Sequence, residues 1–393
     1  MFLQAKTSKF ILIVGLFVGF LGSLKFLYID NKDFLNGDLS RGQIVGRDFL
    51  HSWTAVKLAS EGKYDDIYNP ELLISHSPDD VKKTGVAFNF AYPPQTLALL
   101  LPLSNFNYIT SLIIWGCFSI LCYISSSIIF EKKVSNIALL LIAPTTFLNI
   151  SMGQNGLFTA ALLISGLILL ESKPRLSGIL FGILTIKPHL GILIPVALIA
   201  GGYKKSFLWA MISTICFFVI SLIVFGSGVW EAWFNNAPWV YAKNFIENGT
   251  GFALFMQPSP FMTIRLLFNN TELAWLTQII SAILSSGCVI YTFKKSHSLE
   301  LKASVLITAT YLVSPYIHSY DMAALNFVMI WQARKGLENG FIYGEQTLLV
   351  VAWVMPLIMM SIGYLGFPIF PLITLLMLSV LVYKVNITKN DKL

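Results

Sequence analysis

Apolar runs recur along the whole chain, from residue 10 to residue 384, with short polar or charged stretches between them. The runs have about the length of an α-helical membrane span, ~20 mostly apolar residues, and they lack the strict alternation of membrane β-barrel strands. The pattern predicts an all-α polytopic membrane protein. We expect residues 1–393 to form one integral-membrane domain whose first apolar run is an uncleaved span.

Lysine and arginine gather in small groups at the ends of the apolar runs. Such groups stay on the cytoplasmic side of a membrane, so seven of them predict six excursions and about twelve crossings (eleven to thirteen), with both termini cytoplasmic. The groups are Lys6/Lys9, Lys132/Lys133, Lys173/Arg175, Lys204/Lys205, Lys294/Lys295, Arg334/Lys335 and the lysine-containing C-terminus. The crossings are expected at residues 10–29, 106–130, 134–150, 157–171, 176–186, 190–202, 206–226, 273–293, 300–315, 319–333, 346–364 and 368–384.

Two of these segments, 176–186 and 190–202, are each shorter than the ~20 residues of a straight span. They form two crossings, a re-entrant pair or one broken span, and the pattern leaves all three open. Because cations flank the pair on both sides, the turn "TIKPHLG" between them is expected to point away from the cytoplasm.

Two long loops are expected on the external side of the cytoplasmic membrane, at residues 30–105 and 227–272. The first loop holds ten of the chain's twenty acidic residues. This concentration of negative charge indicates either a built site or a solvated platform.

A polar group opens an expected amphipathic helix in the first loop. Arg47, Asp48 and His51 lie at its start, and apolar residues recur at helical spacing from Phe49 to Val56. A helix of this kind lies on the bilayer surface. Asp48 is either a functional carboxylate or a helix N-cap, since an aspartate before a helix is a good cap.

Two further polar stretches are expected to face the same side. Tyr92 precedes two prolines in "FNFAYPPQTLALLLPL", where the alternative interpretation is a plain loop-to-helix boundary. Gln154 and Asn155 lie in the turn "SMGQNGLF", where the alternative is a glycine turn with polar caps.

A last group combines Lys187 and His189 in "IKPHL" with His318 and Asp321 in "SPYIHSYD". A lysine at a proline-broken helix junction is costly in a membrane, which favours a function, although its long side chain could also snorkel to the interface. A lone histidine near a membrane boundary is more often an interfacial polar residue than a catalytic one.

Composition narrows the class of function. The formal net charge is +7, but the cations are scattered at span ends and form no basic stripe, so we expect no nucleic-acid partner. The cysteines show no metal-type spacing and all lie within apolar runs, so we expect no disulfide framework, metal site or cofactor. They are Cys117, Cys122, Cys216 and Cys288.

One reaction matches a carboxylate, several cations and a groove that reaches into lipid. When a hydroxyl attacks the anomeric carbon of a lipid-phosphate sugar, a base must take the hydroxyl's proton and positive charge must stabilise the departing phosphate. Lysine, arginine or histidine can supply that charge in place of a metal.

The ordered set of stretches "RDFLHSWTAVKLASEGKYDDIYNP", "FAYPPQTLALLLPL", "GQNGLFTAALLISGLILL", "GILFGILTIKPHLGILIPVAL" and "SPYIHSYDM" resembles glycosyltransferase family 87. These are GT-C-fold mannosyltransferases that use polyprenyl-phosphate mannose, and the resemblance runs from about residue 45 to residue 325. It implies that Asp48 is the catalytic base. It also implies that Tyr92–Pro94, Gly153–Asn155 and Lys187 line the donor and acceptor cavity.

The second long loop departs from the family pattern. Members often carry an N-Q-S element there, whereas this chain reads "FMQPSPFMTIRLL", with Met256 before Gln257 and Pro258 before Ser259. Arg265 then offers a cation to a phosphate or is a plain interfacial arginine.

The resulting hypothesis is an inverting glycosyltransferase that moves a hexose, mannose by the resemblance, from a polyprenyl-phosphate donor to a glycolipid or glycan hydroxyl outside the membrane. Asp48 would deprotonate the acceptor, and the product would be an α-mannoside. Membrane lipid surrounds the enzyme. The donor phosphate and the substrates would be bound by Arg47, His51, Tyr92, Gln154, Asn155, Lys187, His189, His318 and Arg265.

Three alternatives stay open. A flippase of lipid-linked sugars is favoured by the broken helix at Lys187, since discontinuous helices commonly form transport sites. A surface-glycan ligase or polymerase would consume a diphosphate-linked oligosaccharide. A non-catalytic scaffold is the third.

Overall fold

The structure is a computed structural model and describes residues 5–35, 45–77, 89–131 and 133–390. Within these ranges all regular secondary structure is helical and no strand occurs. The predicted all-α fold class is therefore confirmed. Two parts of the first expected loop, 36–44 and 78–88, lie outside the described residues.

Six described helices are long and apolar enough to cross a membrane, and a bent pair of helices would make a seventh. The bend of 55° in that pair follows from Pro144, which begins its second helix and cannot donate a backbone hydrogen bond to the first. The six are α1 (Ala5–Leu35), α7 (Tyr108–Phe130), α13 (Lys204–Phe225), α16 (Thr271–Lys295), α19 (Glu345–Tyr364) and α20 (Phe370–Asn390), and the pair is α8 (Val134–Leu141) with α9 (Pro144–Met152).

The other predicted crossings are also helical, but their helices are short. They are α10 (Gly156–Ile168), α11 (Pro174–Ile183), α12 (Leu193–Ala200), α17 (Leu299–Val313) and α18 (Ala323–Asn339). By length and composition the described chain thus offers six or seven spans, and the bundle of about twelve is not confirmed. In α10 and α17 nearly every side chain is buried, so protein, not lipid, surrounds them and their length need not match a bilayer.

The short pair predicted at 176–186 and 190–202 has a defined break. After α11 come two 3₁₀ turns, η2 (Leu184–Ile186) and η3 (Pro188–Gly191), with Lys187 between them, and α12 follows. Pro188 has no backbone N–H, which prevents a continuous helix through this point.

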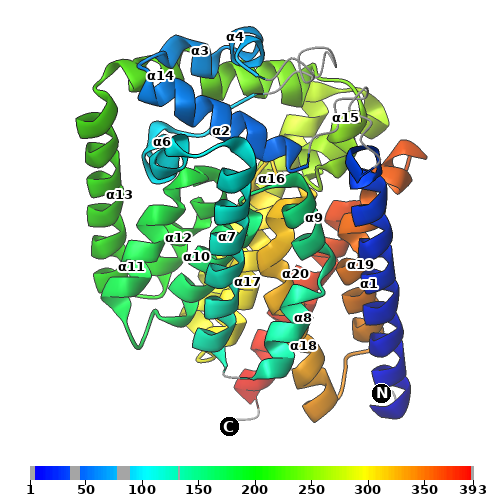
Figure 1. The fold of residues 1–393 in the computed structure, drawn as a ribbon. Helices are drawn as coiled ribbons and strands as arrows, with labels where there is room; N and C mark the ends of the chain where they lie inside the picture. Colours follow the sequence, from blue (N-terminus) through cyan, green and yellow to red (C-terminus); the bar gives the residue numbers. More distant parts are fainter. Residues whose placement is uncertain (1–4, 36–44, 78–88, 132, 391–393) are drawn as a thin grey trace.

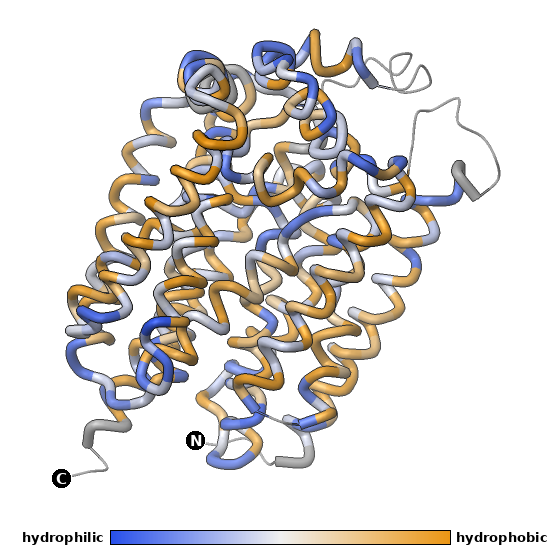
Figure 2. Tube along the Cα trace, turned by 60° about the vertical axis from the view of Figure 1, so that its left-hand side comes forward, coloured by the Kyte–Doolittle hydropathy of each residue, from blue (hydrophilic) through white to orange (hydrophobic). Residues whose placement is uncertain are grey.

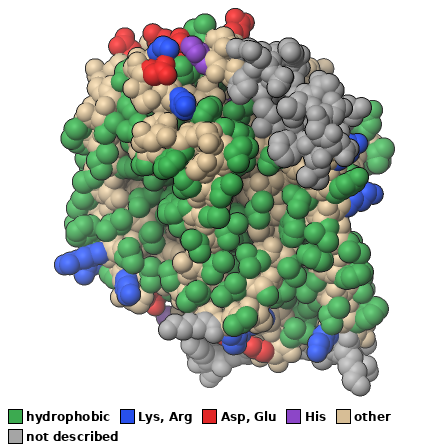
Figure 3. Space-filling model, in the orientation of Figure 1, with side chains coloured by type: hydrophobic (Ala, Val, Ile, Leu, Met, Phe, Trp, Pro, Cys, Tyr) green, Lys and Arg blue, Asp and Glu red, His purple; other side chains and the backbone are tan. Residues whose placement is uncertain are grey.

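The long helices run side by side in one bundle, and both the start of α1 and the end of α20 lie at its lower end (Figure 1). Hydrophobic residues fill the middle of the bundle and hydrophilic ones concentrate at its two ends (Figure 2). On the face shown in Figure 3, acidic side chains gather at the upper end and several Lys and Arg side chains lie along the lower edge.

Short helices cover the upper end (Figure 1). One of them, α2, is the amphipathic helix predicted from residue 49 onward, and it buries Phe49, Val56 and six other side chains. The set comprises α2 (Arg47–Ser60), α3 (Tyr64–Tyr68), α4 (Pro70–Ser75), α6 (Pro94–Leu100), η1 (Leu101–Asn105), α14 (Gly228–Tyr241), η4 (Ala242–Glu247), η5 (Phe252–Met256) and α15 (Pro260–Phe268); η6 (Ser319–Met322) lies between α17 and α18.

Two glycines let α11 approach α13 closely. A Cβ added at Gly178 would lie 2.4 Å from the Ser206 carbonyl oxygen, and one at Gly182 would lie 2.4 Å from the Ser213 side chain. Small residues four apart allow this contact between helices in a membrane, where packing rather than the hydrophobic effect drives association.

We predict that Gly182→Leu lowers the free energy of unfolding by about 2 kcal/mol, because the new side chain must push α13 away. Thermal unfolding of the purified protein in detergent measures this. Gly287→Leu is the matched control, since a Cβ at this glycine of α16 has no atom within 4 Å. Equal losses in the two variants would contradict the packing argument.

Candidate active site

The start of α2 is fixed by backbone contacts to two other helices. Gly46 has φ +67°, and its N–H donates to the Ser151 carbonyl at 3.0 Å. The Tyr108 hydroxyl of α7 donates to the carbonyl oxygens of Val45 (2.6 Å) and Gly46 (2.8 Å). Gly46, not Asp48, therefore holds the N-cap position, and the interpretation of Asp48 as a cap is wrong.

Asp48 lies in the first turn of α2, where its carboxylate meets the turn between α9 and α10. Its Oδ2 accepts a hydrogen bond from Gln154 Nε2 at 2.8 Å, and its Oδ1 lies 4.0 Å from Arg47 Nε. Burial raises the pKa of the Asp48 carboxyl above its usual range, and Arg47 and the Gln154 hydrogen bond oppose this rise only in part. A carboxylate in this state is suited to accept a proton.

Arg47 makes its closer contact elsewhere. Its guanidinium forms an ion pair with Asp30 near the end of α1, and Asp30 also accepts a hydrogen bond from the Ser151 hydroxyl. The sequence analysis missed Asp30 as a site residue because it is one of ten acidic residues in the expected loop and no motif distinguishes it.

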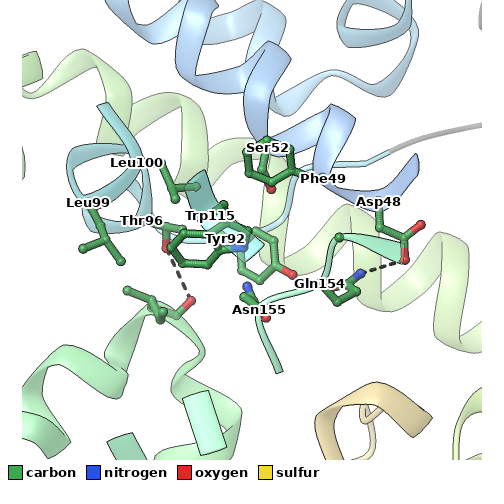
Figure 4. A pocket seen from close by; sticks show the side chains of 12 residues that line it. Asp48, Phe49, Ser52, Tyr92, Thr96, Leu99, Leu100, Trp115, Gln154 and Asn155 are labelled. Atoms are coloured by element: carbon green, nitrogen blue, oxygen red, sulfur yellow. Dashed lines mark hydrogen bonds between the residues drawn. The ribbon is translucent and has the colours of Figure 1, made fainter. Parts of the chain in front are cut away.

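A pocket opens beside Asp48 and is seen from close by in Figure 4. Gln154 and Asn155 lie on one side of the Tyr92 ring, and Thr96 with Leu99 and Leu100 of α6 lie on the other. Asp48, predicted as the base by resemblance, thus lies at the same pocket as Tyr92, Gln154 and Asn155, which the resemblance predicted to line the substrate cavity. The pocket is lined by Asp48, Phe49, Ser52, Tyr92, Thr96, Leu99, Leu100, Trp115, Gly153, Gln154, Asn155 and Ile186.

The proline-initiated helix α6 begins as the alternative interpretation of "YPP" proposed, with Pro94 in its first turn. It also connects the pocket to the helix break. Gln95 Nε2 donates to the Thr185 carbonyl at 3.1 Å, and Thr96 Oγ1 donates to the Ile186 carbonyl at 3.4 Å. These bonds satisfy carbonyl groups that the break after η2 leaves without helical partners.

Lys187 forms a buried ion pair with Asp321 in η6. The distance from Lys187 Nζ to Asp321 Oδ1 is 2.5 Å, and the two side chains are only 3% and 1% exposed. Lys187 Nζ also lies over two aromatic rings, 5.6 Å from the centre of Tyr92 and 5.2 Å from that of Tyr320. The predicted membrane lysine therefore lies directly behind the pocket-lining Tyr92, with a carboxylate as its partner.

The two predicted histidines of this group are linked by aromatic rings. His189 and His318 both contact Tyr316, with ring centres 5.5 Å and 4.9 Å apart, and His318 also contacts Tyr320 at 4.9 Å. The backbone N–H of His318 donates to Asp321 Oδ2 at 3.2 Å. His189, His318, Lys187 and Asp321 thus form one cluster, as the sequence analysis grouped them.

Two predicted substrate-binding residues, His51 and Arg265, do not line the pocket beside Asp48. Burial lowers the pKa of His51 to about 3. Arg265 of α15 donates to the Gly249 carbonyl at 2.5 Å, which connects α15 to the preceding part of the second long loop. No described contact joins Arg265 to the Asp48 pocket.

The stretch "FMQPSP", where the chain departs from the family pattern, leads into α15. Ser259 caps α15, its Oγ accepting from Met262 N–H at 3.1 Å. Met256 packs against the buried cluster of Leu148, Met152 and Tyr320. The neighbouring Gln257 is 3% exposed, and its side-chain amide has no hydrogen-bond partner among the described residues.

A sequence model of glycosyltransferase family 87 matches residues 90–315, more than half of the chain. The chain belongs to glycosyltransferase family 87. A search of curated proteins and a search of solved structures found no match. A member of this family transfers sugar from a donor to an acceptor, and the matched region contains Tyr92, Gln154, Asn155 and Lys187.

We predict that Asp48→Asn stabilises this family 87 enzyme at neutral pH. Because the carboxyl's pKa is higher in the folded than in the unfolded protein, ionised Asp48 costs stability, and this cost grows as pH rises through the folded-state pKa. Thermal unfolding across pH should show a gain near pH 7 that shrinks toward zero as pH falls to about 4. Asp65→Asn, at an exposed carboxylate of α3, is the control variant.

A second prediction concerns the buried ion pair. Lys187→Met should lower the free energy of unfolding by about 3–5 kcal/mol because it leaves the Asp321 charge buried without its partner. The double variant Lys187→Met/Asp321→Asn should recover most of this loss. Lys335→Met, in an exposed pair with Glu338, is the control and should change stability little. Additive losses in the double variant would contradict the prediction.

Proposed function

We propose that this family 87 enzyme is an inverting mannosyltransferase of the GT-C fold, which moves mannose from a polyprenyl-phosphate donor to a hydroxyl of a glycolipid or glycan. The observation that carries the proposal is the position of Asp48. Its carboxylate lies at a pocket under the amphipathic helix α2, with its pKa raised by burial and its Oδ2 oriented by Gln154.

In the proposed reaction, Asp48 accepts the proton of the acceptor hydroxyl. The acceptor oxygen attacks the anomeric carbon of the donor and forms the new glycosidic bond. The bond from that carbon to the phosphate oxygen breaks, and its electron pair leaves with the polyprenyl phosphate. Attack from the face opposite the leaving group inverts the anomeric centre, so a β-linked donor yields an α-mannoside.

Lys187 is the proposed cation for the departing phosphate. It lies behind Tyr92, whose ring lines the Asp48 pocket, so a sugar in the pocket would place its phosphate toward this lysine. His189 and His318 are close enough to interact electrostatically with the partner of Lys187, Asp321, and are proposed to assist. Because His51 and Arg265 do not line the pocket, we do not include them among the proposed phosphate-binding cations.

The position of the site in the bundle supports an interfacial, lipid-borne substrate. Both α2 and α14 lie at the upper end, opposite the start of α1 and the end of α20 (Figure 1). Aromatic side chains typical of a membrane interface occur on α14, where Trp230, Trp233 and Phe234 contact one another. We propose that this end faces outward from the cytoplasmic membrane and that the termini are cytoplasmic.

We predict that Asp48→Asn lowers the transfer rate by about 10²–10⁴-fold, because the acceptor proton then has no base. The measurement is release of label from radiolabelled polyprenyl-phosphate mannose by purified protein in detergent, with an envelope lipid extract as acceptor. Asp65→Asn is the matched control and should keep wild-type transfer.

Three outcomes would contradict the proposal. Full transfer by Asp48→Asn would show that Asp48 is not the base. If the wild-type enzyme moves lipid-linked sugars across a vesicle membrane without breaking the sugar–phosphate bond, the break at Lys187 belongs to a flippase. If it consumes only diphosphate-linked oligosaccharides, the enzyme is a ligase or polymerase.

A further inference from the structure

Arg47 stands between two carboxylates that come from different helices. Its terminal nitrogen Nη1 pairs with Asp30 Oδ1 on α1, whereas its Nε lies 4.0 Å from Asp48 Oδ1, too far for a hydrogen bond. The arginine is adjacent in sequence to the proposed base, yet its direct contact is with the more distant residue.

Asp30 is held in place by contacts of its own. Its Oδ2 accepts from the Ser151 hydroxyl, which also accepts from Asn31 Nδ2 at 2.9 Å. The Ser151 carbonyl in turn accepts the Gly46 N–H at the start of α2. The Asp30 side chain is 10% exposed. One carboxylate thus connects α1, α9 and the first turn of α2.

This arrangement matters for a base. An arginine beside an aspartate tends to form two parallel hydrogen bonds with it, and a carboxylate in such a pair accepts a proton poorly. With Nη1 held by Asp30, that paired geometry is not formed at Asp48. The Gln154 amide, which is uncharged, supplies the hydrogen bond that orients Asp48 instead.

We propose that Asp30 is a positioning residue of this enzyme, which holds the Arg47 guanidinium against α1 and so leaves the Asp48 carboxylate able to accept the acceptor's proton. This inference rests on the proposed role of Asp48. The other titratable groups that act on Asp48 are Lys187 across the pocket and the Tyr92, Tyr108 and Tyr320 hydroxyls. They are unchanged in the variants below.

The test is the pH dependence of kcat/KM for labelled polyprenyl-phosphate mannose, which reports ionisations of the free enzyme. In Asp30→Asn, Arg47 turns to Asp48, so the rate should fall about tenfold and the acid limb of the profile should move to lower pH. Arg47→Gln should move the limb in the opposite direction, to higher pH, because Asp48 then loses a cation.

A double-variant cycle separates positioning from a direct effect of the Asp30 charge. If Asp30 acts through Arg47, then Asp30→Asn should hardly move the limb in an Arg47→Gln background. The double variant Asp30→Asn/Arg47→Gln lacks both charges of the ion pair and so leaves neither charge unpaired. It therefore still allows the test if Asp30→Asn alone folds poorly. Asp30→Glu, which retains the charge, should keep the limb near its wild-type position.

Ser151→Ala controls for structure, since it removes a hydrogen bond to Asp30 without removing charge. If Asp30→Asn and Ser151→Ala both lower the rate and neither moves the limb, Asp30 is only a structural link and the inference is overturned. A shift that persists in the Arg47→Gln background overturns it as well. Full transfer by Asp48→Asn would instead refute the proposed function, and this outcome is read from a different variant.

Discussion

The ion pair between Lys187 and Asp321 is the constraint on which the rest of the site depends. Charges in an apolar bundle must be paired, and here both partners are almost completely buried. The lysine lies at the break between η2 and η3, and the aspartate lies in η6, so the pair joins two segments that are 134 residues apart in sequence. The break is possible because α6 supplies hydrogen bonds to the carbonyls of Thr185 and Ile186.

Hydrogen bonds and close packing link this ion pair to the proposed base, Asp48. Asn149 of α9 donates to the Tyr320 carbonyl, next to Asp321, at 2.9 Å. The same carbonyl would lie 2.3 Å from a Cβ at Gly156, so only glycine allows α10 to start this close. Between Asn149 and Gly156 runs the turn that carries Gln154 to Asp48. A shift of η6 would therefore move the side chain that orients Asp48.

Sequence reasoning predicted the helical segments to within a few residues because apolar runs determine where helices form in a membrane. It could not give the number of spans, since a buried helix such as α10 and a lipid-facing one have similar composition. It grouped Lys187 with Asp321 because few charges occur in apolar runs. It missed Asp30, and it could not predict the burial of His51, which the order of residues does not encode. The hydrogen-bond partner of Arg265 could not be predicted from sequence either, because it is a backbone carbonyl.

The charges of the two clusters differ, and the difference has a consequence for the proposed reaction. Lys187 and Asp321 together are neutral, whereas Asp30, Arg47 and Asp48 together carry one net negative charge when both carboxylates are ionised. The net negative charge repels an anionic phosphate from the Asp48 side, whereas the Lys187 side carries no net charge. Between them lie the pocket and the Tyr92 ring. In the proposed mechanism the donor thus has one favourable orientation, with its phosphate at Lys187 and its sugar toward the base. Charge alone favours this orientation, independently of contacts to the sugar.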